Sequence, residues 1–142
     1  LIAAACGLRF ETTPLLQERH FGELRGRPYD SLGFDPLTMT GAPAGGESVA
    51  AFLARVAEAF EWLLQRQGSL GGTLAVVSHG LVIRAMLDHH LRLPEGTRLP
   101  ERIDNTSVTA VALQPLPTAT LVDCTAHLGD GVADHALGLS GG

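Results

Sequence analysis

Thr73-Leu-Ala-Val-Val-Ser-His-Gly-Leu-Val-Ile-Arg84 is the stretch that decides the fold of this chain. Its apolar, β-branched first half predicts a buried strand over Thr73–Ser78, and a second apolar-periodic stretch predicts a helix from about Leu81 to Leu91. His79 and Gly80 form the polar corner between them. The pattern therefore predicts an imidazole at the carboxyl end of a core strand and at the amino end of a helix.

That position favours an anionic ligand such as phosphate. Ligands of open α/β sheets bind beyond the carboxyl ends of the strands, and a helix amino terminus offers free N–H groups and partial positive charge. Gly80 also lacks the Cβ that would crowd such a ligand. A lone histidine such as His79 can instead cap the helix or lie half-buried with its ring satisfied, so a catalytic interpretation needs a second group.

Glu18 is the candidate for that second group. It lies in a charged, glycine-punctuated loop over residues 15–26. Hydrolysis of a phosphate ester needs a positioned phosphate and a proton for the leaving oxygen, which a carboxyl group can hold, while a histidine stabilises charge on the phosphoryl group. From spacing alone, the pairing of Glu18 with His79 is a hypothesis.

The composition sets limits on the function. With 142 residues and 45% hydrophobic content, the chain fits one domain with a real core. Its ten basic residues are all arginine, are scattered, and leave a net charge of -5, so we expect no nucleic-acid partner. Cys6 and Cys124 show no disulfide or zinc spacing. We expect no metal, membrane span or signal peptide, and therefore a cytoplasmic protein.

The remaining elements alternate between helix and strand. Ser48 is the expected N-cap of a long helix that ends at Gly68, and its apolar stripe consists of Val49, Phe52, Leu53, Val56, Phe60, Leu63 and Leu64. Ser107–Leu113 and Thr118–Val122 predict an antiparallel hairpin. The fold class is therefore α/β, with one sheet and helices on both faces.

The first residues predict the end of a helix at Leu1–Gly7 and a short strand at Leu8–Glu11. We therefore expect one or more elements to be missing before Leu1, although a short helix at the true terminus is an alternative. Residues 28–46 predict a surface excursion with one helical turn near Tyr29–Leu32. The glycine-rich residues 129–142 predict a flexible tail.

Five blocks of this sequence resemble the histidine phosphatase superfamily. Leu16–Gly26, Gly45–Ser48 and Val77–Arg84 are similar to three of its blocks, in order, and Asn105–Val108 and Thr125–Leu128 are similar to the closing blocks of its phosphoglycerate-mutase-like branch. The resemblance implies a single phosphoglycerate mutase-like α/β domain over residues 1–128.

Carried over by position, the resemblance implies that Glu18 is the proton donor and His79 the second catalytic histidine, in contact with the transferring phosphoryl group. Gly80 would let the backbone approach the phosphate, and Arg19 and His20 would line the substrate side. The resemblance implies no metal and no organic cofactor.

Two further charged residues of these blocks leave alternatives open. A capping role for Glu47 is at least as well supported as a catalytic one. For Arg84 we favour a structural ion pair over contact with substrate.

The chain departs from the family pattern at one decisive point. Residues 1–142 contain neither the Arg-His-Gly block, whose histidine becomes phosphorylated, nor a second phosphate-binding arginine. No other histidine is a convincing substitute; the others are His20, His89, His90, His127 and His135. We therefore expect a carboxy-terminal part of a phosphatase that is nearly inactive alone.

The expected substrate is a phosphorylated small molecule, hydrolysed through a phosphohistidine intermediate. Phosphoglycerate mutase is an alternative, because Arg19-His20 resembles the acidic-loop sequence of the mutases, although the modest excursion before Gly45 favours a phosphatase. A non-catalytic anion-binding module is a second alternative. An unpaired sheet edge would favour a homodimer or domain-swapped self-association of such a module.

Overall fold

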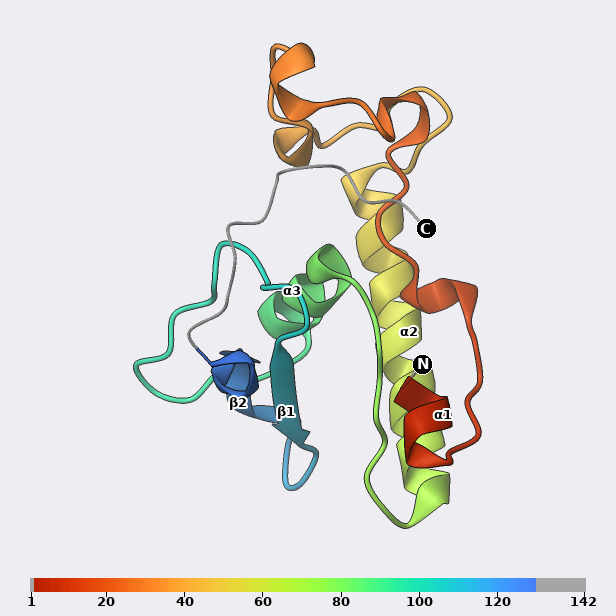
Figure 1. Cartoon of the computed structure of the whole chain (residues 1–142), viewed down its shortest axis with the longest axis vertical. Helices are drawn as coiled ribbons and strands as arrows, with labels where there is room; N and C mark the ends of the chain where they lie inside the picture. The colour runs from red at the N-terminus through yellow and green to blue at the C-terminus, as the bar shows by residue number, and fades with distance from the viewer. Residues whose placement is uncertain (1, 130–142) are drawn as a thin grey trace.

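The computed structural model describes residues 2–129 of the chain, which combine helices with a small antiparallel sheet (Figure 1). The helices are α1 (Ile2–Cys6), α2 (Val49–Leu70) and α3 (Gly80–His89), and the strands are β1 (Val108–Ala112) and β2 (Thr118–Cys124). This mixture confirms the α/β class. Apart from Gly129, the predicted flexible tail lies outside the described residues.

Helix α2 begins where the sequence predicts. The Ser48 hydroxyl accepts the backbone N–H of Ala51 at 3.1 Å, as expected of an N-cap. The predicted end at Gly68 is wrong, because the helix continues to Leu70. Gly71 ends it instead, at φ 60° and ψ 17°, which is the left-handed conformation that a helix C-cap favours in glycine.

The core lies between α2 and α3. Phe52 and Val56 of α2 pack against Val82 and Ala85 of α3. Partly buried apolar side chains surround this cluster, namely Leu16, Leu53, Leu81 and Met86. The first half of the predicted stripe on α2 is therefore core, and Leu16 brings the loop before Glu18 into contact with it.

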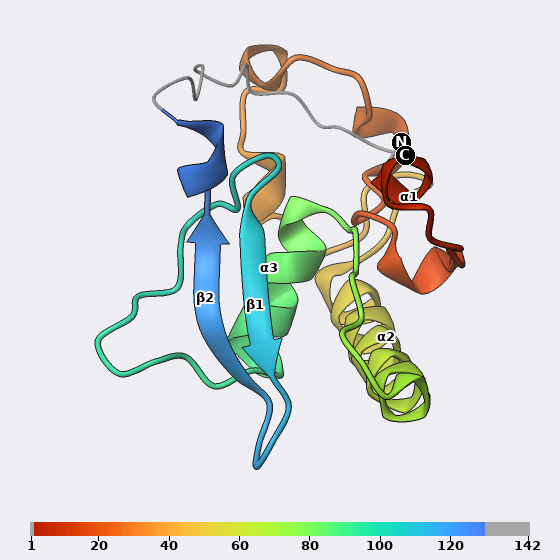
Figure 2. The same cartoon turned by 60° about the horizontal axis from the view of Figure 1, so that its bottom comes forward.

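The hairpin is confirmed. β1 and β2 are antiparallel, with Val108 opposite Cys124 and Ala112 opposite Thr118. In the described part of the chain the sheet consists of these two strands alone, and α3 lies behind β1 (Figure 2). The expected arrangement of helices on both faces of a larger sheet is therefore not formed within residues 2–129.

Two predicted strands are wrong. Residues 73–78 run between α2 and β1 in both views, but they form no ladder, and Val76 and Val77 are 42% and 72% exposed (Figures 1 and 2). Leu8–Glu11 is also irregular. A strand needs a neighbouring backbone to complete its hydrogen bonds, and an apolar sequence does not supply one.

The predicted helix end at Gly7 is confirmed within the described residues. Gly7 has φ +65°, and the next N–H, of Leu8, donates to the Ala3 carbonyl at 2.9 Å. The predicted excursion is also confirmed: residues 28–46 extend beyond the amino end of α2 and contain 3-10 turns at Tyr29–Ser31 and Pro36–Thr38 (Figure 1). No helix in residues 2–129 has the length and apolarity to cross a membrane.

Candidate active site

Glu18 and His79 meet at the amino end of α3. One carboxylate oxygen of Glu18 accepts the backbone N–H of Leu81 at 3.1 Å, and the other accepts the N–H of Arg19 at 2.9 Å. His79 is the N-cap residue of α3, with extended backbone and no capping bond from its side chain. The carboxylate therefore caps the helix, and the imidazole belongs to the same helix end.

A second contact joins the two segments. The Ser78 hydroxyl donates to the carbonyl oxygen of Leu16 at 2.9 Å. The loop before Glu18 and the corner before His79 are thus connected on both sides of the two candidate residues. This local network explains how groups far apart in the sequence form one site.

Arg55 of α2 holds the backbone of the Glu18 loop. Its guanidinium donates to the carbonyl oxygens of Leu15, Gln17 and Glu18 at 2.9, 2.8 and 3.4 Å. It also binds both carboxylate oxygens of Glu47, at 2.9 and 2.8 Å. Sequence reasoning missed Arg55, whose only signal was a cation beside the apolar stripe of a helix.

Glu47 is not the cap of α2, because Ser48 caps that helix. Hydrogen bonds from Arg55 lower the pKa of Glu47, and burial opposes them only in part. Its carboxylate also accepts the backbone N–H of His20 at 3.4 Å. The side chain therefore serves as the anionic partner that fixes Arg55.

Arg19 is buried, at 4% exposure. Its guanidinium donates to the carbonyl oxygens of Glu47, Met39 and Gly41 at 3.2, 2.8 and 3.2 Å, and lies over the ring of Phe21. Burial lowers the pKa of Arg19. These contacts hold the excursion against the loop. The substrate-side role that the resemblance implies for Arg19 stays a prediction.

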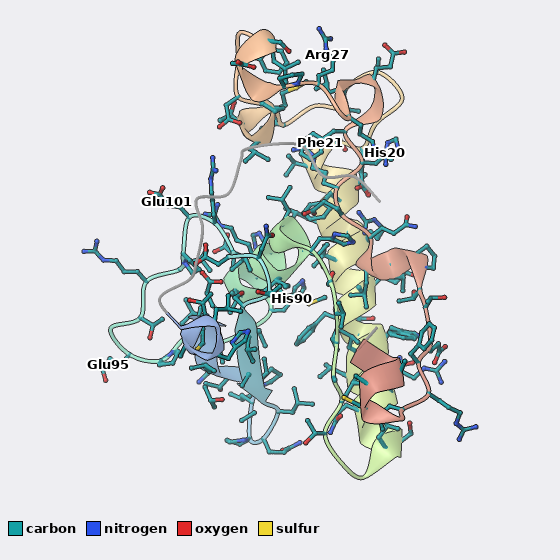
Figure 3. All side chains as sticks on the ribbon, in the orientation of Figure 1. His20, Phe21, Arg27, His90, Glu95 and Glu101 are labelled. Atoms are coloured by element: carbon teal, nitrogen blue, oxygen red, sulfur yellow. The ribbon has the colours of Figure 1, made fainter. Side chains whose placement is uncertain are left out.

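His20 lies at the base of the excursion, beside Phe21 (Figure 3). Its Nδ1 accepts the N–H of Gly22 at 3.2 Å, and its Nε2 is 3.5 Å from a guanidinium nitrogen of Arg25. A cleft of about 470 Å³ opens here, with Glu18, His20 and Arg25 among its lining residues. A substrate-side role for His20 stays a prediction that this position supports.

Glycines close the base of the excursion. A Cβ on Gly46 would lie 2.5 Å from Pro43 Cγ and 2.7 Å from the His20 carbonyl oxygen, and one on Gly22 would lie 2.0 Å from the Ala44 carbonyl oxygen. Gly80 differs, because a Cβ there would make only ordinary contacts with Ile103, at 3.8 Å and beyond. Contacts within the protein therefore do not require glycine at position 80. That Gly80 lets the backbone approach a phosphate stays a prediction.

Arg84 donates to the carbonyl oxygen of Glu101 at 2.9 Å. Because this partner is a backbone oxygen and not a carboxylate, the predicted ion pair is wrong. The contact is nevertheless structural, as the prediction favoured. The bond holds the segment before β1 against α3.

The other described histidines lie elsewhere. His89 and His90 end α3, at the opposite end from His79, and His90 stacks on Phe60 with the ring centroids 5.0 Å apart. His127 belongs to a 3-10 turn after β2, and His135 lies outside the described residues. Within residues 2–129, no cluster of three or more candidate ligands is suited to a metal ion.

The chain belongs to the histidine phosphatase superfamily, whose branch 1 sequence profile matches residues 1–117. Relatives described as probable phosphoglycerate mutase GpmB occur in Yersinia enterocolitica, Yersinia pestis and Yersinia pseudotuberculosis. Each is 32% identical over 126 residues, a match that covers 82% of this chain and 58% of the relative. The chain therefore spans little more than half of these relatives, and the predicted domain end at Leu128 stays a prediction.

Proposed function

We propose that this chain supplies the proton donor and one phosphate ligand of a phosphatase that hydrolyses small phosphomonoesters through a phosphohistidine. The observation that carries the proposal is the convergence of Glu18 and His79 on the amino end of α3. Family membership supports the same chemistry. The nucleophilic histidine would come from sequence outside residues 1–142.

In the first step, the histidine nitrogen attacks phosphorus, the bond to the leaving oxygen breaks, and Glu18 gives that oxygen its proton. In the second step, water attacks phosphorus, the phosphorus–nitrogen bond breaks, and Glu18 accepts the proton of the water. His79 and the amide groups at the start of α3 stabilise the phosphoryl oxygens in both steps. The scheme uses no metal and no organic cofactor.

The first test concerns the 142-residue chain alone. We expect negligible hydrolysis of an aryl phosphate, because the nucleophilic histidine of the proposed scheme is missing from residues 1–142. The assay follows phenolate release, with His79→Ala as the control for contaminating phosphatase. Robust turnover by the chain that disappears in His79→Ala would contradict a nucleophile outside residues 1–142.

The second test concerns the polypeptide encoded by the complete reading frame around these residues. Glu18→Gln should reduce turnover of an alkyl phosphate by about 10²- to 10⁴-fold, the usual contribution of general acid catalysis. The loss on an aryl phosphate should be much smaller, because a phenolate leaves without a proton. Equal losses on both substrates would remove Glu18 from the role of proton donor.

The names of the relatives favour a second candidate, a phosphoglycerate mutase. We keep phosphatase as the leading proposal because the excursion between Glu18 and Gly45 is short, with only 3-10 turns over residues 28–46. Incubating the complete polypeptide with 3-phosphoglycerate separates the two. Release of inorganic phosphate supports a phosphatase, and conversion to 2-phosphoglycerate without release supports a mutase.

A non-catalytic anion-binding module is the alternative from another class. Reading the coding sequence upstream of Leu1 tests it: an in-frame Arg-His-Gly after an apolar strand supports the enzyme, and a stop codon there supports the module. We also propose a cytoplasmic location, in keeping with Cys6 and Cys124, which are both free thiols. Fractionation of the source cells checks the location.

A further inference from the structure

The cleft beside the Glu18 loop is lined by more cations than anions. Three arginines line it, namely Arg19, Arg25 and Arg55, against two glutamates, Glu18 and Glu47. The whole chain carries a net charge of -5, so the cleft differs in sign from the molecule around it. Because a concave site concentrates ions of the sign opposite to its own, this cleft should attract anions.

The three arginines make different contacts. Arg55 binds the carboxylate of Glu47, and the guanidinium of Arg19 donates to three backbone carbonyl oxygens. Arg25 lies beside a histidine instead, with one guanidinium nitrogen 3.5 Å from Nε2 of His20. The contact between Arg25 and His20 is therefore the one in which the partner of the guanidinium is not an oxygen of the protein.

This contact brings two hydrogen-bond donors together. His20 Nδ1 accepts the backbone N–H of Gly22 at 3.2 Å, so Nδ1 carries no hydrogen. In a neutral imidazole the hydrogen then lies on Nε2, which is the nitrogen beside Arg25. A guanidinium has donors only, so neither side chain accepts a hydrogen from the other.

One oxygen atom of a ligand would satisfy both donors. Two nitrogens that lie 3.5 Å apart leave room for an oxygen at the usual distance of about 2.9 Å from each. The fork of N–H groups on a guanidinium matches the oxygens of carboxylate and phosphate groups, and an ionised acceptor makes the bond shorter and stronger. The arrangement of His20 and Arg25 therefore suits an oxyanion.

We propose that His20 and Arg25 bind one oxyanion group, a carboxylate or a phosphate, of a small organic molecule. The cleft volume of about 470 Å³ lies within the range of about 300–1,000 Å³ that is usual for small-molecule sites. The oxyanion is either a second anionic group of the substrate, because Glu18 lines the cleft and also reaches α3, or a separate anion. Binding of an oxyanion by this pair does not depend on catalysis by Glu18 or His79.

The first probe is malonate, a small dicarboxylate without phosphate, added to the isotope-labelled 142-residue chain and followed by NMR. Before malonate is added, neutral His20 should carry its hydrogen on Nε2. During the titration, the His20 Nε2 and Arg25 Nε signals should shift together and saturate. A neutral His20 with its hydrogen on Nδ1, or no saturable shift at either side chain, would overturn the proposal, and neither result requires a variant.

Two arginine substitutions provide a matched pair. Arg27 is not among the residues that line the cleft, and it lies farther along the excursion than His20 (Figure 3). Arg25→Gln and Arg27→Gln each remove one positive charge, so long-range electrostatic effects are similar in both variants. Arg25→Gln should weaken malonate binding by about tenfold or more, and Arg27→Gln should change it less than about twofold. Equal weakening by both variants would overturn the proposal.

The second probe is 3-phosphoglycerate, which carries both a phosphate and a carboxylate and identifies the source of the oxyanion. If the oxyanion belongs to the substrate, 3-phosphoglycerate should shift His20 and His79 with one dissociation constant and displace malonate. If the oxyanion is a separate anion, malonate should stay bound while 3-phosphoglycerate shifts His79 alone. Both results support the oxyanion site. Failure of the proposed phosphatase would appear separately, as absence of hydrolysis by the complete polypeptide, and would leave the malonate result unchanged.

Discussion

Arg55 connects the long helix to the loop that carries Glu18. Its five hydrogen bonds leave the loop carbonyls and the Glu47 carboxylate satisfied in a partly buried setting. The Glu18 carboxylate is then free to reach the start of α3. We infer that Arg55 positions Glu18 through the backbone of its loop.

Removing Arg55 should therefore be costly. Arg55→Ala should reduce the free energy of unfolding by about 2 kcal/mol, because it leaves Glu47 and three carbonyl oxygens without their partner. The matched control is Arg66→Ala, which breaks the exposed pair with Glu11 and should cost less than about 1 kcal/mol. Urea unfolding of both variants measures the difference, and equal costs would contradict the positioning role.

The sequence predicted Glu18 and His79 as the candidate catalytic residues, and the structure places both at the amino end of α3. Arg55 and the crowded glycines could not be predicted in the same way. Arg55 acts through carbonyl oxygens of a loop forty residues away, and backbone acceptors have no sequence signature. The burial of Arg19 could not be predicted for the same reason, because its three acceptors are also backbone carbonyl oxygens.

The excursion and the loop that carries Glu18 form one structural unit. Residues 20–23 of the loop cross residues 44–47 of the excursion, and hydrogen bonds join the two segments there. The N–H of Glu23 donates to the Ala44 carbonyl at 3.0 Å, and the N–H of Glu47 donates to the His20 carbonyl at 2.7 Å. Gly22 and Gly46 allow this close approach. The crossing sets where His20 lies relative to the cleft.

A methyl group at this crossing should force the two segments apart. Gly46→Ala should destabilise the protein by about 1–3 kcal/mol, the usual cost of overpacking. Gly41→Ala is the control, since its Cβ would enter open space and its φ is not positive, so its effect should be within about 0.5 kcal/mol. Thermal unfolding compares them, and an unperturbed Gly46→Ala would refute the close approach.

The helices were predicted well because their signals are local. The Ser48 cap and the 3.6-residue apolar period lie within a few turns. The strand expected at Thr73–Ser78 did not form, because its pairing depends on a neighbour that residues 2–129 do not provide. The helix end moved from Gly68 to Gly71 because the glycine that adopts a left-handed conformation ends the helix.

At the scale of the whole molecule, acid should destabilise the fold in two stages. Burial and the neighbouring His89 lower the pKa of His90 below 6.5, with Glu61 opposing, so the folded state binds fewer protons there than the unfolded state. The stability that neutral His90 provides is present above pH 6.5 and is lost as the pH falls through its folded pKa. Glu47 follows below pH 4.5, because its folded pKa is also lowered.

Unfolding in urea between pH 7.5 and pH 3 tests this order. The free energy of unfolding should fall with pH below 6.5, and His90→Gln should remove that first stage while leaving the fall near the Glu47 titration. A stability that rises as the pH falls below 6.5 would reverse the predicted sign.

The central claim is that Glu18 and His79 form one phosphate site at the amino end of α3. Titration of the 142-residue chain with inorganic phosphate, followed by NMR, tests it most directly. We predict that the His79 ring and Leu81 amide signals shift together and saturate, because phosphate binds at the helix end where both groups lie. Saturable shifts confined to His20 and Arg25, or no saturable shift at His79, would contradict the claim.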